Sequence, residues 1–135
     1  MRFLNTVRGG IGIRVLFVFV TLAVVGVCVY SLLEVQRSNI RQNHRIAAER
    51  SDQGLQVVME SNADVVRVDP MRFAGVPRTA APDGWYEVTV SASRADSVVN
   101  IRIAATGVCG SEKVVQERSV TLTRRGSDST ATWEP

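Results

Sequence analysis

The most marked hydrophobic pattern in the chain is an apolar block from Val15 to Leu33, VLFVFVTLAVVGVCVYSLL, which contains no charged side chain. As a helix with a rise of about 1.5 Å per residue, the block extends roughly 28 Å, close to the hydrocarbon thickness of a bilayer. The rest of the chain is too short to cover an apolar surface on every side of such a helix. The pattern therefore predicts a segment that spans a membrane. The segment is predicted to be a helix, because in lipid the backbone must form its hydrogen bonds within the segment.

A second, amphipathic pattern follows from residue 34 to residue 61 without any proline. Small and apolar residues form a narrow stripe on one side: Ile40, Ala47 and Gly54 at intervals of seven, with Ser51, Leu55 and Val58 beside them. The pattern predicts one continuous helix from near Ile11 to near Ser61. Arg37, Arg41 and Arg45 recur every four residues on another side. We interpret that side as a solvated face, or as a contact for lipid headgroups or for acidic faces of neighbouring subunits.

The C-terminal half alternates between apolar and polar residues, which is typical of half-buried strands. The clearest strand is predicted at residues 85–94, and a second follows at 98–106 after a short turn. After a turn at GVCGSE, a third strand is predicted at 113–125. Its alternation breaks near Gln116 and Arg118, which predicts a bulge or an edge strand there.

Together these elements predict an α+β fold, in which a long N-terminal helix packs on a small antiparallel β-meander. The small-residue stripe of the helix is the available cover for the apolar side of the sheet. Residues 71–84, with Pro77 and Pro82, are predicted to form a loop. The predicted organisation is a basic leader (1–10), a membrane-spanning helix (11–33), its amphipathic continuation (34–61), a sheet domain (62–125) and a frayed polar tail (126–135).

Composition narrows the class of protein further. The chain has 135 residues, so the part outside the apolar block is one small domain and not a multidomain enzyme. The net charge of +3 suits a membrane-proximal protein and does not indicate nucleic acid. We find no nucleophile elbow, phosphate-binding loop or metal-ligand spacing, and expect neither an enzyme nor a cofactor. Isolated candidate residues are assigned no chemical role. We interpret His44 as an ordinary helix histidine, and the carboxylates of the pairs Asp64–Asp69 and Asp83–Glu87 as surface groups. Trp85 is expected to be a packing residue, and Trp133 to dock either on a partner or on the sheet.

The two cysteines are not expected to bond to each other. Cys28 lies in the apolar block and Cys109 beyond it, so their Cα atoms are farther apart than the roughly 7 Å that a disulfide allows. We interpret Cys28 as a small apolar residue. Cys109 is expected in a loop, as a shielded free thiol or as one half of an intermolecular disulfide.

The residues before the apolar block, MRFLNTVRGGIGIR, are basic and contain no acid. A secretory signal peptide is one interpretation, but the apolar run is longer than a usual signal core and no small-residue cleavage site closes it. Arginines flank both ends of the block, so their count does not decide its orientation. We expect the short basic end inside the cell and the C-terminal domain on the periplasmic side of the inner membrane.

Three segments in this order resemble type IV pilins and pseudopilins. They are VRGG followed by IGIRVLFVFV, then RQNHRIAAERSDQGLQVVMES, and finally IRIAATGVCGSEKVVQERSVTLTRR. The resemblance implies a leader ending in Gly9 and Gly10 that prepilin peptidase removes, with Ile11 as the mature N-terminus. It also implies a filament subunit whose partners are other pilin or pseudopilin subunits. Close helix packing would use Gly12, Ala23, Gly26 and Ser31, because small residues let helices approach in a membrane.

One position departs from that family. Pilins usually carry a glutamate at the fifth residue after the cut, and this chain has Val15 there. The resemblance implies that the acid pairs with the N-terminal amine of a neighbour, so a subunit without it suits the tip of a filament better than the shaft. The departure equally fits a single-span anchored binding module that enters no filament.

Overall fold

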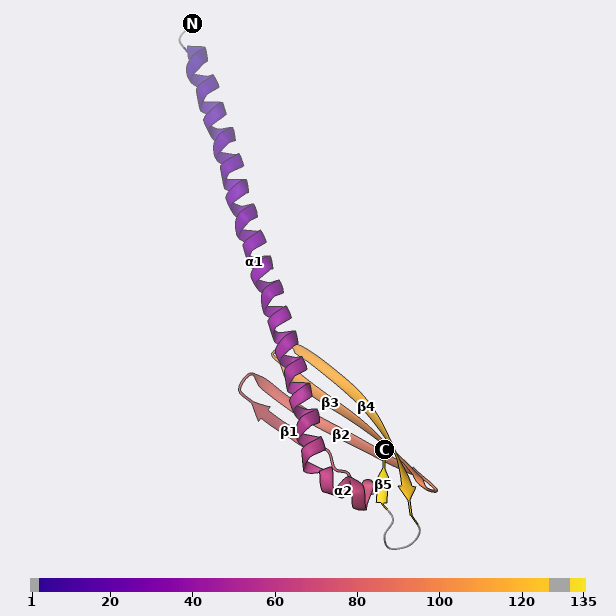
Figure 1. Cartoon of the computed structure of the whole chain (residues 1–135). Coiled ribbons are helices and arrows are strands. Elements are labelled where there is room, and N and C mark those ends of the chain that lie inside the picture. Colours follow the sequence, from indigo (N-terminus) through magenta and orange to yellow (C-terminus); the bar gives the residue numbers. More distant parts are fainter. Residues whose placement is uncertain (1–2, 127–131) are drawn as a thin grey trace. The chain divides into compact units, whose positions relative to one another are not determined.

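The computed structural model describes residues 3–126 and 132–135. The elements, in chain order, are α1 (Phe3–Ser61), α2 (Ala63–Val68), the 3₁₀ turn η1 (Pro70–Arg72), β1 (Val76–Ala81), β2 (Gly84–Ala95), β3 (Val98–Cys109), β4 (Glu112–Arg125) and β5 (Thr132–Glu134). Figure 1 shows one long N-terminal helix followed by a curled antiparallel sheet, so the predicted α+β class is confirmed. The chain divides after Asn39 into two compact units, which are described separately.

The first unit is helical throughout its described residues. The helix α1 begins at Phe3, earlier than the predicted start near Ile11, and it continues without a break through Glu34. Glycines lower helix stability by about 1 kcal/mol each relative to alanine but do not end a helix. The apolar side chains of residues 13–33 are exposed within the chain, for example Phe17 at 72%.

The second unit contains the sheet, whose strands follow one another in the order β1-β2-β3-β4-β5, every neighbouring pair being antiparallel. The predicted strands at 85–94, 98–106 and 113–125 correspond to β2, β3 and β4. The register between β3 and β4 is continuous from Val98–Thr123 to Cys109–Glu112. The bulge expected near Gln116 and Arg118 is therefore absent from this pair, although β4 is an edge strand there because β5 pairs only with its last residues.

The helix covers the apolar side of the sheet through its small-residue stripe, as the sequence predicted. Ala47, Ser51 and Val58 are completely buried. They lie above a core that includes Val88, Val99, Ile101, Ile103, Ala105 and Leu122. Burial of these side chains supplies the main stabilisation of the unit, at about 25 cal/mol for each Å² of apolar surface removed from water.

Helix and sheet approach most closely at Gly107 of β3. A Cβ built on Gly107 would lie 2.0 Å from the carbonyl oxygen of Ala47 and 2.4 Å from the amide nitrogen of Ser51. No real Cβ tolerates such distances, so the backbone of α1 rests directly on the backbone of β3. The sequence analysis placed Gly107 in a turn, and this was wrong because β3 continues to Cys109.

The end of α1 is tied to the following loop by the buried side chain of Asn62. Its Nδ2 donates to the carbonyl oxygens of Val58 (2.8 Å) and Ala74 (2.9 Å), and its Oδ1 accepts from the Ala74 N–H (2.9 Å). The chain then forms α2 and η1, so the sheet domain expected at 62–125 begins with helical turns. In η1 the side chain of Asp69 accepts from the N–H of Met71 and Pro70 stands at the first helical position, where no N–H is needed.

Two short strands were missed by the sequence analysis. The expected loop 71–84 contains β1, which pairs with β2 despite Pro77, because an edge strand tolerates a missing N–H. The expected frayed tail contains β5, whose Trp133 is buried in the core. Residues 127–131 of that tail, and Met1 and Arg2 of the leader, lie outside the described residues.

Candidate functional site

The apolar part of α1 is the first candidate surface. Over the described residues, one helix near the N-terminus is long and apolar enough to cross a membrane. None of the window that satisfies this test is buried within the chain. The small residues predicted to pack on neighbouring helices, Gly12, Ala23, Gly26 and Ser31, are all exposed there. A Cβ at Gly12 or Gly26 would meet nothing within 4 Å, so the chain itself offers no reason for either glycine.

The positions that the pilin resemblance assigns to processing lie in the same helix. Gly9, Gly10 and Ile11 have helical backbone, and Gly10 is exposed with open space around it. Val15, which stands where the family has glutamate, is half exposed at 49%.

The stripe of small residues in the second unit divides into buried and exposed parts. Ala47 and Gly54 lie against the sheet, and a Cβ on Gly54 would contact Val88 Cγ2 at 2.9 Å. Ile40, about two turns before Ala47, is exposed at 52%. Ile40 therefore does not pack on the sheet of its own chain, although the sequence placed it in the same stripe as Ala47 and Gly54.

The opposite side of α1 in this unit is polar and solvent-exposed. Arg41 and Arg45 are followed by Glu49, Asp52 and Glu60 along the exposed side. Arg45 Nε lies 3.4 Å from Glu49 Oε1, an ion pair at i and i+4. Basic residues thus lie toward Ile40 and acidic residues toward Ser61.

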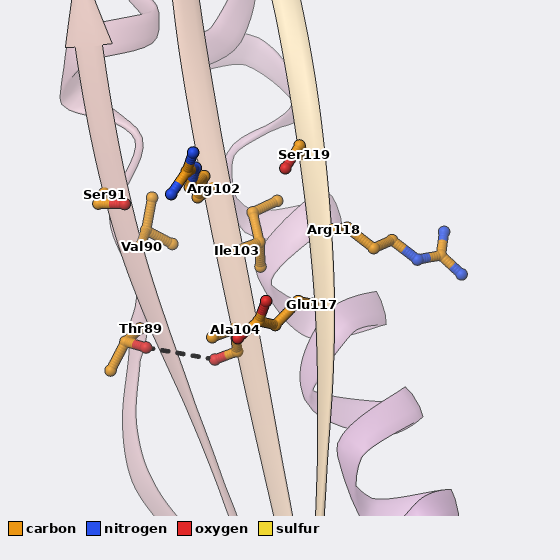
Figure 2. A pocket seen from close by; sticks show the side chains of 9 residues that line it. All are labelled: Thr89, Val90, Ser91, Arg102, Ile103, Ala104, Glu117, Arg118 and Ser119. Carbon is orange, nitrogen blue, oxygen red and sulfur yellow. Dashed lines mark hydrogen bonds between the residues drawn. The ribbon is translucent and has the colours of Figure 1, made fainter.

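The outer side of the sheet carries an open hollow. It has a volume of about 530 Å³ and is lined by residues 89–91 of β2, 102–104 of β3 and 117–119 of β4. Figure 2 shows Ser91 and Ser119 on either side of Arg102, with Arg118 extending away from the other side chains. The register agrees, because Arg102 is paired with Ser91 on one strand and with Ser119 on the other.

This hollow is open, its lining is of mixed polarity, and its charged lining residues are Arg102, Glu117 and Arg118. The hydroxyl of Thr89 donates to the carbonyl oxygen of Ala104 at 3.4 Å, so part of the polar lining is engaged within the sheet. Arginine with neighbouring hydroxyl groups can bind an anionic or hydroxyl-rich surface. Nothing in the lining supplies a nucleophile activated by an adjacent base.

Three of the remaining candidates, His44, Asp69 and Asp83, lie close to an oppositely charged residue type. His44 Nδ1 lies 3.7 Å from Glu112 Oε2. Asp83 Oδ2 lies 3.4 Å from Arg50 Nη2, and Asp69 Oδ2 lies 3.3 Å from Arg72 Nε. No group of three or more His, Cys, Asp or Glu side chains within the described part of the chain has the geometry to hold a metal ion.

Cys109 and the two tryptophans have definite environments. Cys109 is the last residue of β3, not a loop residue, and its buried thiol lies 3.7 Å from Asn43 Oδ1. Trp85 is partly buried, with the Arg78 guanidinium carbon 4.0 Å from its ring centroid. Trp133 docks on the sheet, which resolves the alternative left open by the sequence.

Sequence reasoning missed three features that position these surfaces. They are the Asn62 bridge, the close approach at Gly107 and the contact between Arg50 and Asp83. The alternation of Trp133 between Thr132 and Glu134 was a usable signal for β5, whereas the other features depend on long-range contacts. Comparisons with models of protein families, with curated proteins and with solved structures give no match for this chain.

Proposed function

We propose that this chain is a minor subunit of a type IV pilin-like or pseudopilin filament, with a structural role in assembling or capping it. Residues 11–33 would anchor the chain in the inner membrane, and the sheet unit would lie on the periplasmic side. Other subunits, membrane lipid and prepilin peptidase are the partners that this proposal requires. The filament would serve adhesion, motility, DNA uptake or secretion.

The observation that carries the proposal is the nature of α1. Its apolar side chains between residues 13 and 33 have no cover within the chain, and the same helix supplies the cover of the sheet from Ala47 onward. An apolar surface on every side of a helix is stable only in lipid or among equivalent helices. The same helix would thus be the membrane anchor and part of the core of the sheet unit, and this double role supports the proposal of a filament subunit.

Processing of the leader is the decisive test. In cells with active prepilin peptidase, the intact mass of the membrane-extracted protein should lack residues 1–10, and Ile11 should carry an N-methyl group. Gly10→Leu should block the cut, because a bulky side chain directly before the scissile bond would hinder the close approach of the peptidase to the backbone. Gly12→Leu is the matched control, since it places the same side chain after the bond and should leave processing intact. A retained leader in the unaltered protein would remove the main support for the proposal.

A membrane-anchored binding module is the second candidate, favoured by the open polar hollow around Arg102. Such a protein would use residues 11–33 only as a span and would display the outer side of the sheet to a ligand. It would keep its N-terminal residues and would not co-purify with sheared filaments. Val15 fits this candidate as well as it fits a tip subunit, so processing and filament association decide between them.

A further inference from the structure

The two edges of the sheet differ in their ability to accept a further strand. The β1 edge is short, contains Pro77, and shifts its register with β2 between Val76 and Thr79. A proline and an irregular register both hinder an edge strand from pairing with another chain. The β4 edge has neither proline nor glycine from Glu112 to Arg125, and its register with β3 is continuous. The sheet can therefore be extended at β4 more readily than at β1.

A short part of the β4 edge already carries a strand. Within the described residues, β5 pairs with β4 only from Thr123 to Arg125. Residues 112–122 are paired with β3 on one side and have no strand on the other. On that side, every second backbone N–H and C=O group needs water or a further strand as its partner. An antiparallel strand in line with β5 would satisfy these groups.

A recess lies on the α1 side of this free edge. It has a volume of about 210 Å³ and is lined by Asp52, Leu55, Gln56, Met59 and Arg118. Arg118 belongs to the α1 side because its partner in β3 is the core residue Ile103. Residues that pair across two strands share a face, so a side chain opposite Arg118 on an added strand would point into this recess. An apolar side chain there would pack on Leu55, on the 48% exposed Met59 and on the methylene stem of Arg118.

The outer side of the same edge favours a basic residue. Glu117 is exposed and is paired with Ala104, whose side lies away from α1. Opposite charges that face each other across two strands attract, and like charges repel. Charged residues on an edge also hinder indiscriminate pairing with apolar strands. The edge therefore suits a strand with apolar residues toward α1, polar residues on the outer side and a basic residue opposite Glu117.

A second copy of this chain does not fit the edge when both copies are anchored in one membrane. The strand β4 runs in the same direction as α1, because Glu112 lies beside His44 (3.7 Å, Oε2 to Nδ1) and Arg118 lies beside Asp52. Antiparallel pairing of β4 with β4 would set the two α1 segments of the sheet units in opposite directions. The β1 edge of a second copy has the correct direction, but Pro77 and the shifted register hinder its pairing.

We propose that residues 112–122 of β4 bind an extended segment of a different protein, which adds to the sheet as an antiparallel strand in line with β5. Main-chain hydrogen bonds supply the affinity, and the recess and Glu117 supply the selectivity. The exclusion of a second copy rests on the proposed function, because it assumes chains anchored by the same end. The inference goes beyond that function by identifying the conformation and the side-chain pattern of a further partner.

A peptide of this pattern tests the site on the full-length chain in detergent. The probe is Val-Thr-Val-Lys-Val-Thr-Val with blocked ends and a fluorescein label, and its binding is measured by fluorescence anisotropy. One N-methylated form carries its methyl groups on the valines, and a second carries them on the threonines and the lysine. Alternate N–H groups of a strand point to opposite sides, so one form should lose at least about tenfold in affinity and the other should stay within about twofold of the parent. A loss in both forms or in neither, or no binding of the parent up to about 1 mM, would overturn the inference.

A charge exchange tests the position of the peptide. Glu117→Lys should weaken binding at least about threefold, and replacing the lysine of the peptide by glutamate should restore it. Glu87→Lys is the matched control, because it makes the same charge change on β2, which has a strand on each side. Equal effects of the two variants would show general charge attraction and overturn the assignment. Hydrogen exchange should slow in residues 112–122 on binding, and slowing confined to other segments would overturn it too.

The alternative occupant is tested in membranes. Ser119→Cys on a Cys28→Ala background, with buried Cys109 kept, should give no disulfide between copies. A disulfide that forms readily would identify a second copy as the occupant and overturn the inference. Leader cleavage is measured separately, because peptide binding does not require it. A cleaved leader without peptide binding refutes this inference alone, whereas a retained leader with normal peptide binding refutes the proposed function and leaves the site in place.

Discussion

Replacing Gly107 by alanine tests whether the direct contact between helix and sheet holds the second unit together. The new Cβ would lie 2.0 Å from the Ala47 carbonyl oxygen, while ordinary contact begins at 3.4 Å. The two elements must therefore separate locally by about 1.4 Å, the difference between these distances. The three nearest obstructing atoms, from Ala47, Arg50 and Ser51, all belong to the helix backbone, so no side-chain rotation can relieve the clash.

The magnitude follows from the packing that the separation removes. A gap of 0.5–1 Å already forfeits about a quarter to a half of each van der Waals contact, and overpacking a core costs about 1–3 kcal/mol. Alanine also lowers the conformational entropy of the unfolded chain, which stabilises the folded state by about 0.4–1 kcal/mol where the backbone conformation is compatible. Gly107 lies within the regular strand β3, so this smaller gain applies. We expect a net destabilisation of roughly 2 kcal/mol, and a melting temperature lower by about 8–16 °C for a unit of this size.

The assay is denaturant and thermal unfolding of the full chain in detergent, followed by the fluorescence of Trp85 and Trp133. Gly54→Ala is the matched control on the helix side of the same interface. Its Cβ would meet side-chain atoms only, Val88 Cγ2 at 2.9 Å and Tyr86 Cδ2 at 3.2 Å, and alanine raises helix propensity by about 1 kcal/mol. We expect this control to change the stability by less than about 1 kcal/mol.

Two results would refute the reasoning. If Gly107→Ala were neutral or stabilising, the helix would not rest on β3 as the structure has it. If Gly54→Ala destabilised as much as Gly107→Ala, the interface would respond to any added methyl group, and the distinction between backbone and side-chain obstruction would fail.

Three further substitutions test other parts of the fold and the proposal. Asn62→Ala removes the side-chain partner of the N–H and carbonyl of Ala74, and should lower the free energy of unfolding by about 1–3 kcal/mol, at about 0.5–1.5 kcal/mol for each lost hydrogen bond; a loss below 0.5 kcal/mol, on the order of a surface change, would show that the bridge is dispensable. Trp133→Ala should cost about 3 kcal/mol in the same denaturant titration because it empties part of the core; an unchanged midpoint would mean that β5 does not contribute to the core. Val15→Glu should increase the amount of the subunit in sheared filaments, measured by immunoblot, if the missing acid confines it to the tip; equal amounts would count against that explanation.

The parts of the fold that the sequence predicted are those whose signal is local. The strands β2, β3 and β4 alternate over many residues, and the stripe of Ala47 and Gly54 recurs with the helical period. Each pattern reports which side of its own element is buried. The strands β1 and β5 are short, and Pro77 in β1 resembles a loop residue until its pairing with β2 is known.

The candidate surfaces were harder to predict because they depend on which side of an element remains free. The charges of residues 41–52 are visible in the sequence, but their exposure follows from the burial of Ala47 and Ser51 against β3. The hollow around Arg102 depends on the pairing of three strands. Gly107 was assigned to a turn because glycine is common there, whereas its role is to let another backbone approach.

The glycines of α1 connect the fold to the proposed function. Gly54 is crowded by Val88 and Tyr86, so the chain's own packing explains why the helix accepts the cost of glycine there. Gly12 and Gly26 have nothing within 4 Å, yet each lowers helix stability by about 1 kcal/mol relative to alanine. Lipid adapts to either residue, whereas a neighbouring helix in a membrane approaches most closely at small residues such as glycine. Under the proposed function, another helix in the membrane would be the partner that accounts for Gly12 and Gly26.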